Sequence, residues 1–487
     1  MSNRKESDVN FLVSEEILPT TEGKRTISAL DLFFIWAAIA INIGGFAMAF
    51  SLYPQFSPLA ILGIVFLGYL ICVILIVFIG DIGLTYGITY SVFIRSSFGY
   101  LGSHLPGLVR VVSCLFWCGF QTWLAATAMD AIMVIATGYS NLWLMIILFT
   151  IIQVANACFG IKAMAKFDGP AVVFLLIVLA VLLGTIINMN NTSVITIMQT
   201  AADPTAPKIS IALAISGAAG GWIAIPVTFM DISRTMKRKR DFATQSFWQR
   251  NKGVVFSTLV GITIISPVMM LCGLISGVLT GTWNPIEFAQ IAFASKPAVL
   301  IICFLSILFA QWSTNTAANM LPAANILVNI NPKLVKFPYA MILVGILSVV
   351  IRPWIYLSKL YFMLAILSAL VGPLLGILLT DYYILRKRKL NVPALFKKGS
   401  QYEYANNFNP AGIISLVVSC VIGMLCSMDF ALYIGMAVSM ILYYVLMKYW
   451  IIKKYPQAEL DPDYNPVYDY DGRDIGFGTD PVSGSGE

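Results

Sequence analysis

Residues 57–80 read SPLAILGIVFLGYLICVILIVFIG, an apolar stretch without a charged side chain. A helix needs about 20 apolar residues to cross the hydrocarbon core of a bilayer, so this stretch is long enough to span a membrane. Similar stretches recur along the chain of 487 residues, which is 59% hydrophobic and 11% charged, with a mean hydropathy of +0.83. Soluble globular chains carry about 25% charged residues. The sequence therefore predicts an all-α polytopic membrane protein and excludes a water-soluble enzyme.

We expect about twelve transmembrane helices from these stretches. They are predicted at residues 29–54, 57–80, 104–137, 141–160, 168–190, 208–232, 253–282, 297–328, 337–356, 360–385, 410–428 and 430–452. Several are longer than a bilayer requires, which indicates tilted or interrupted helices.

Lysine and arginine are distributed unevenly over the predicted loops. An even number of spans puts both tails on one side, and 27 of the 31 basic residues then fall on that side. The opposite side holds only Lys208, Lys296, Arg352 and Lys359. Cytoplasmic loops are enriched in Lys and Arg, so we expect a multi-pass protein of the cell membrane with both termini in the cytoplasm. The net charge of +7 is spread too thinly to indicate nucleic acid as a partner.

Two spans contain helix-breaking residues near mid-membrane. In the first, two glycines follow Asn42; in the sixth, Gly217, Gly221 and Pro226 surround Trp222. Glycine lowers the cost of leaving helical geometry, and proline removes a backbone donor. For either span alone, the alternative is that glycine allows close helix packing. Spans one and six are five apart, however, as a five-plus-five inverted repeat requires, and matched interruptions indicate a secondary-transporter site.

The third span places Trp117 and Gln121 on one helix face, because they are four residues apart. A flat ligand with donors and acceptors suits this pair, since the indole can stack on it and the carboxamide can hydrogen-bond to it. The alternative is an interfacial tryptophan beside an interhelical glutamine bond.

The eighth span is rich in uncharged polar groups between Gln311 and Asn319. Ala310, Ser313 and Thr314 share one helix face, and hydroxyls beside exposed carbonyls are hard ligands that suit a small alkali cation. The alternative is that the hydroxyls bond back to carbonyls of their own helix. A regular helix puts Asn319 off the face of this pair.

At these residues the chain resembles the first nucleobase–cation symporter family, the permeases for cytosine, uracil, thiamine, allantoin and other purine-related compounds. The similar stretches are Ile35–Asn42, Leu115–Leu124, Gly220–Trp222 with Asp231, Trp312–Asn319 and Gly372–Tyr382. The resemblance implies a LeuT-type inverted repeat of five plus five helices, followed by two C-terminal helices. It divides the chain into a cytoplasmic N-terminal tail (1–28), two five-helix repeats (29–190 and 208–390), two extra helices (391–454) and a disordered acidic cytoplasmic tail (455–487).

The resemblance also implies a role for individual residues. Trp117 and Trp222 would sandwich a planar ring, while Gln121 and Asn319 would hydrogen-bond to its amides. Asn42 and Gly221, at the two interruptions, would line the same pocket. A sodium ion would be held by the carbonyls of Ala38, Ile41 and Ala310 together with the hydroxyls of Ser313 and Thr314.

The expected function is a symporter that imports a hydantoin, allantoin or a pyrimidine or purine base by alternating access. Sodium is the expected coupling ion, and the protein is expected to act as a monomer in a lipid bilayer. Proton coupling in the same fold stays open as an alternative. A channel is disfavoured because tryptophans at the interruptions indicate occlusion. An integral-membrane enzyme is disfavoured because the sequence has no Walker A lysine, no Cys/His metal cluster and only one histidine, His104.

Overall fold

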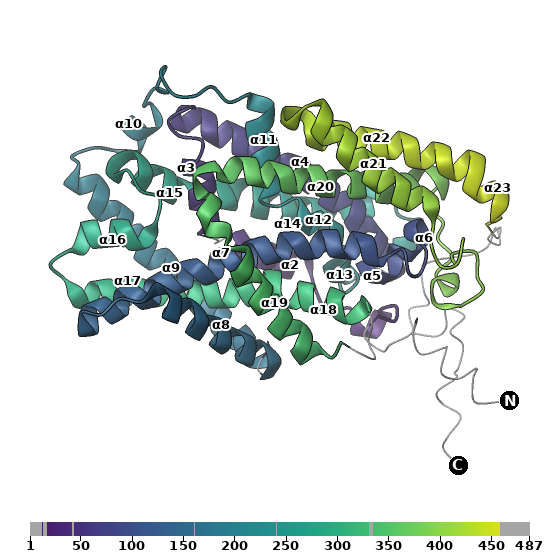
Figure 1. The fold of residues 1–487 in the computed structure, drawn as a ribbon, viewed down its shortest axis with the longest axis horizontal. Helices are drawn as coiled ribbons and strands as arrows, with labels where there is room; N and C mark the ends of the chain where they lie inside the picture. The colour runs from purple at the N-terminus through teal and green to yellow at the C-terminus, as the bar shows by residue number, and fades with distance from the viewer. Residues whose placement is uncertain are drawn as a thin grey trace, which may run out of the picture.

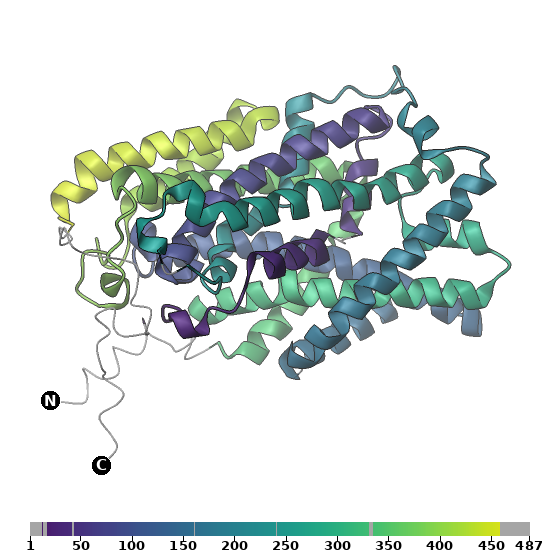
Figure 2. The same ribbon diagram turned by 180° about the vertical axis from the view of Figure 1, so that it is seen from behind.

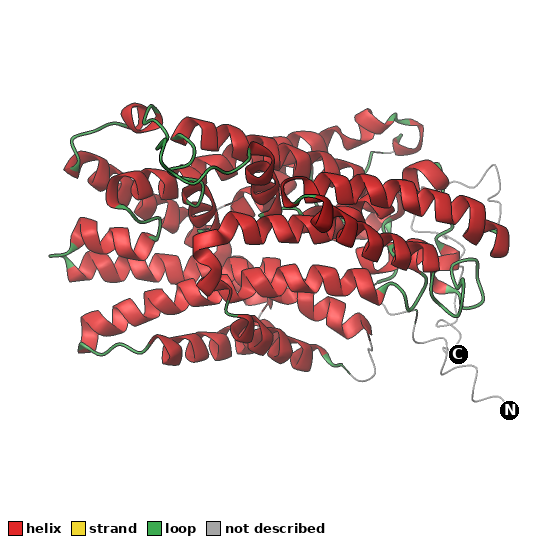
Figure 3. Cartoon of the chain, turned by 45° about the horizontal axis from the view of Figure 1, so that its top comes forward, coloured by secondary structure: helices red, strands yellow, loops and turns green. Residues whose placement is uncertain are grey.

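The computed structural model describes residues 12, 17–40, 43–159, 161–239, 241–330 and 335–457. Within these residues the regular structure is entirely helical (Figure 3), and β-type pairing is limited to two isolated bridges, Ile27 with Met236 and Ala405 with Phe408. The predicted all-α class is therefore confirmed.

Each of the twelve predicted spans contains one helix or a row of consecutive helices. The first six are α2 (Ala29–Ala40) with α3 (Gly44–Phe50), α4 (Pro58–Tyr86), α7 (His104–Thr137), α8 (Leu142–Phe159), α9 (Ile161–Met189), and α11 (Ile211–Gly220) with α12 (Ala224–Thr228) and α13 (Met230–Ser233). The last six are α14 (Phe247–Val260) with η3 (Gly261–Ile265) and α15 (Ser266–Thr280), α17 (Pro297–Asn315) with η4 (Thr316–Met320) and α18 (Leu321–Ile330), α19 (Phe337–Ile351), α20 (Leu360–Leu379) with η6 (Thr380–Leu385), α21 (Pro410–Cys426), and α22 (Ala431–Leu446) with η9 (Met447–Ile451) and α23 (Ile452–Lys454).

Length and composition separate these helices into two groups. Among the described residues, seven helical segments are long and apolar enough to cross a membrane, and four shorter apolar helices accompany them. The first span consists of the two short helices α2 and α3. Ile41 and Asn42, between these helices, lie outside the described residues.

The short connecting helices gather at opposite ends of the bundle (Figure 1). Helix α6 (Arg95–Phe98) lies at the same end as α23, whereas α10 (Val194–Met198) and α16 (Pro285–Phe293) lie at the other end. Seen from behind, α2 lies alongside α14 within the bundle (Figure 2). The connections thus alternate between two ends, as a chain that crosses a membrane repeatedly requires.

Two predicted helix boundaries are wrong by six residues, because α4 continues to Tyr86 and α14 begins at Phe247. The reason is a buried ion pair between these helices. Arg250 Nε donates to Asp81 Oδ1 at 2.7 Å and Arg250 Nη2 to Asp81 Oδ2 at 2.5 Å, while Asn251 Nδ2 donates to Asp81 Oδ1 at 2.7 Å. A single charge in the sequence suggests the end of a span, but a paired charge can be buried within one.

Several glycines allow direct contact between helices. A Cβ atom at Gly273 would lie 2.2 Å from Phe46 Cβ, so α3 rests directly on α15. Likewise, a Cβ atom at Gly217 would lie 2.6 Å from the Tyr361 carbonyl oxygen, and a Cβ atom at Gly220 would lie 2.0 Å from the Leu364 carbonyl oxygen. Both distances are too short for a side chain, so only glycine fits at these positions. For Gly217 and Gly220, close packing of α11 on α20 is therefore the correct explanation.

Part of the predicted N-terminal tail is folded against the helices. Thr20 N donates to the Gly87 carbonyl at 2.8 Å, and Arg25 Nη1 donates to the Met236 carbonyl at 3.2 Å. At the other end of the chain, Arg386 Nη1 donates to Gln457 Oε1 at 3.1 Å, so the tail predicted from residue 455 begins too early. Residues 1–11, 13–16 and 458–487, which hold the rest of both predicted tails, lie outside the described residues.

Candidate functional site

A cavity lies where the interruptions of the first and sixth spans meet α4, α7 and α15. The first span, α4 and α7 contribute Ala40, Gly45, Met48, Tyr69 and Trp117; the sixth span and α15 contribute Gly221, Trp222, Ser266 and Met270. Three residues predicted for substrate binding, Trp117, Trp222 and Gly221, are therefore brought together on one cavity.

Trp117 is 9% exposed and is held by aromatic neighbours on its own helix. Its ring centroid lies 5.6 Å from that of Phe116 and 5.8 Å from that of Phe120, both in edge-to-face geometry. Edge-to-face contacts fix the orientation of a ring. The indole is thus a preformed part of the cavity wall.

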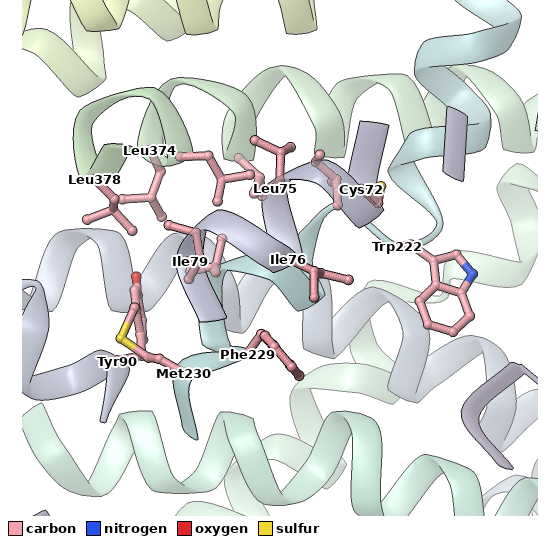
Figure 4. Close-up of a cluster of buried hydrophobic side chains, with 14 of the residues drawn as sticks. Cys72, Leu75, Ile76, Ile79, Tyr90, Trp222, Phe229, Met230, Leu374 and Leu378 are labelled. Carbon is pink, nitrogen blue, oxygen red and sulfur yellow. The ribbon is translucent and has the colours of Figure 1, made fainter. Parts of the chain in front are cut away.

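Trp222 is 7% exposed and lies in the three-residue break between α11 and α12. Figure 4 shows it at the edge of a buried apolar cluster that includes Cys72 and Ile76 of α4. The rings of Trp36 and Tyr69 lie 6.1 and 5.8 Å from the Trp222 ring. Cys72 Sγ also donates to the Ala219 carbonyl at 3.4 Å, which ties the break to α4.

Trp36 in turn connects the first span to the seventh, because its Nε1 donates to Thr258 Oγ1 at 3.0 Å. Trp36 is fully buried, so Thr258→Val should leave an indole donor without a partner. Such a loss costs about 1–3 kcal/mol. We expect this variant to melt at a lower temperature than the wild type, whereas Thr258→Ser, which keeps the hydroxyl, should melt close to it. Equal melting temperatures for all three proteins would contradict the importance of this bond.

Gln121 and Asn319 are buried, but neither is among the residues that line the cavity. Gln121 is 1% exposed, and its Oε1 has no hydrogen-bond partner among the described residues. Asn319 Nδ2 donates to Asn315 Oδ1 at 2.9 Å. Asn315 Nδ2 in turn donates at 3.1 Å to the carbonyl of Cys118, the residue that follows Trp117 in the sequence. Gln121 thus has a free acceptor, while the Asn319 amide is committed to a neighbour. Their contact with substrate stays a prediction.

At the two interruptions, Gly221 is placed on the cavity but Asn42 lies outside the described residues. A Cβ atom at Gly221 would meet the Ala218 carbonyl oxygen at 3.4 Å and Tyr69 Oη at 3.9 Å. Unlike Gly217 and Gly220, Gly221 therefore keeps a wall of the cavity open.

The residues predicted to bind sodium are placed only in part. Ala310, Ser313 and Thr314 lie together on α17, and Thr314 Oγ1 donates to the Ala310 carbonyl at 2.5 Å. This back-bond is the alternative foreseen for the hydroxyls, and after donating its hydrogen the threonine oxygen still has lone pairs that can accept. Ala38 lies in α2, which packs on α14 and η3, whereas α17 packs on α7 and α9; Ile41 is outside the described residues. The cation site stays a prediction.

Tyr69, Ser266 and Met270 line the cavity but were not expected from the sequence. Tyr69 Oη donates to Met270 Sδ at 3.6 Å, which joins α4 to α15 across the cavity wall. The seventh span contains Gly261 and Pro267, residues of the same helix-breaking kind, but they were not interpreted as an interruption. The π-helical turn η3 begins at Gly261 and directly precedes Ser266. π-helical turns are often found at functional sites.

Comparison with known proteins matches this architecture over most of its length. The family model for permeases of cytosine/purines, uracil, thiamine and allantoin matches residues 19–451. The hydantoin permease of Microbacterium maritypicum is 27% identical, with 94% of this chain and 93% of that protein covered.

Two solved structures of Mhp1, a nucleobase–cation-symport-1 family transporter, have the same fold. Its inward-facing conformation gives a TM-score of 0.86 at 28% identity, covering 92% of this chain and 96% of that one. A closed conformation with bound bromovinylhydantoin gives 0.83 at 27% identity, covering 92% and 98%. These matches confirm the LeuT-type fold and identify a multi-pass membrane transporter, not an enzyme. The chain belongs to the nucleobase–cation-symport-1 family, the permeases for cytosine/purines, uracil, thiamine and allantoin.

Proposed function

We propose that this transporter is a secondary-active symporter that imports a planar nitrogen heterocycle, namely a hydantoin, allantoin or a nucleobase, together with sodium. The observation that carries the proposal is the cavity to which α7 and the sixth-span break each contribute an indole, Trp117 and Trp222. Indole faces favour flat rings, and a ring with several N–H and C=O groups needs polar partners at its edges.

The hydantoin permease and Mhp1, both similar over more than nine-tenths of this chain, support this substrate class. Sodium is favoured over protons because Ala310, Ser313 and Thr314 offer only neutral oxygen ligands on one face of α17. We further propose that the protein acts as a monomer in the plasma membrane. Both termini are proposed to be cytoplasmic, because the uneven distribution of Lys and Arg favours this orientation.

The test is a thermal-shift panel on the purified protein with hydantoin, allantoin, uracil, cytosine and purines, each in sodium and in potassium. A ligand that binds the folded state raises the apparent melting temperature. We expect at least one ring compound to raise it, and to raise it more in sodium. No shift with any compound in either salt would contradict the proposed substrate class.

Uptake by proteoliposomes then separates the two coupling ions. An inward sodium gradient at equal pH should drive accumulation of the compound that binds. Accumulation that follows a pH gradient and ignores sodium would instead establish proton coupling and overturn the proposed role of sodium.

A further inference from the structure

Ser266 differs from every other hydroxyl residue of its span. The row of helices from α14 to α15 is fully described and contains six Ser and Thr residues. Five of the six have a hydrogen-bond partner. The Thr258 hydroxyl accepts from Trp36 Nε1. The other four hydroxyls donate to backbone carbonyl oxygens: Ser257 to Ala29, Thr263 to Leu259, Ser276 to Gly273 and Thr280 to Ser276. Ser266 is 3% exposed, and its Oγ has no hydrogen-bond partner among the described residues.

The local backbone explains why this hydroxyl is presented differently. Thr263, inside η3, and Ser276, further along α15, bond back to the preceding turn, as helical Ser and Thr commonly do. Ser266 directly follows the π-helical turn and precedes Pro267. A π-helical turn inserts one residue, so the side chains after it are rotated relative to a regular helix. Ser266 therefore lines the cavity that also holds Trp117 and Trp222.

Other polar groups on this wall cannot replace it. Tyr69 Oη already donates its hydrogen to Met270 Sδ, and the remaining residues that α3 and α15 contribute are Gly45, Met48 and Met270. Leaving a buried hydroxyl unpaired is unfavourable, and a ligand group that enters the cavity would give this one a partner. A hydroxyl can accept from a ring N–H or donate to a ring carbonyl.

We propose that the Ser266 hydroxyl is a further substrate-binding group, which hydrogen-bonds to the edge of the heterocycle that faces α15. This inference rests on the proposed function, since it takes the cavity to be the heterocycle site. It assigns to the seventh span a direct part in substrate selection.

The experiment compares the dissociation constants of hydantoin and uracil for the purified full-length protein, measured by isothermal titration calorimetry in sodium. Ser266→Ala should bind about 3- to 10-fold more weakly than the wild type, as expected for one lost neutral hydrogen bond. Ser266→Cys, which keeps the size but is a weaker hydrogen-bonding group, should fall between them. Ser276→Ala, on the same helix and away from the cavity, should bind like the wild type.

A second measurement separates binding from folding. Without ligand, Ser266→Ala should melt at the same temperature as the wild type or higher, because it removes an unpaired buried hydroxyl. Binding by Ser266→Ala within twofold of the wild type for both compounds would overturn the inference, as would an equal loss in Ser276→Ala. If the wild type bound neither these nor any other ring compound, the proposed function would fall first and this role with it.

Discussion

Trp117→Ala is expected to weaken the binding of a planar heterocycle by roughly 5- to 150-fold. Stacking of a base on an aromatic side chain contributes about 1–3 kcal/mol, and each 1.4 kcal/mol corresponds to about tenfold in the dissociation constant. Trp117 lines the cavity and is already oriented by Phe116 and Phe120, so little ordering cost offsets this contribution. Calorimetric titration in sodium measures the change directly.

Two variants of α7 serve as controls for this result. Trp117→Phe keeps an aromatic face and should lose only part of the affinity. Trp123→Ala removes an equally large ring from the same helix, but Trp123 packs beside Phe120 and away from the cavity, so its affinity should stay near that of the wild type. Near-normal binding by Trp117→Ala would refute the stacking role, and an equal loss in Trp123→Ala would reduce it to a general effect on α7.

The spans and their interruptions could be predicted from the sequence because both have strong local causes. Uninterrupted apolar runs determine where a chain can cross lipid, and glycine with proline marks where a helix can break. Trp222 lies at such a break, and Trp117 lies one helical turn before Gln121, so the sequence pattern singled out both positions, while their joint role around a ring was implied only by the family resemblance. The structure brings the two indoles onto one cavity.

Features that depend on tertiary contacts could not be predicted in this way. The extension of α4 past residue 80 depends on Asp81 meeting Arg250, 169 positions away. The π-helical turn η4 inserts a residue between Thr314 and Asn319, so a regular helical wheel does not describe their relation. Ser266 was missed because Gly261, which begins η3, and Pro267, which follows Ser266, were not interpreted as a break, and the direction in which the π-helical turn rotates a side chain depends on the tertiary structure.

Replacing both Ser313 and Thr314 with alanine is expected to abolish the stimulation of substrate binding by sodium. Coupling between two such sites typically amounts to about 1–3 kcal/mol, which is roughly 5- to 150-fold between sodium and potassium. The double variant should bind substrate equally in both salts, with the affinity that the wild type has in potassium. This follows because the variant removes two of the proposed ligands and leaves the Ala310 carbonyl in place.

Folding should survive the Thr314 change, since the Thr314 hydroxyl bonds within its own helix to Ala310 and alanine is the stronger helix former. Ser306→Ala on the same helix is the matched control, because Ser306 is buried and donates to the Cys303 carbonyl at 2.7 Å. It should keep the full sodium effect. If the double variant still distinguished sodium from potassium, the cation would have to bind elsewhere, and the face of α17 around Ala310 would hold hydroxyls that merely satisfy their own helix.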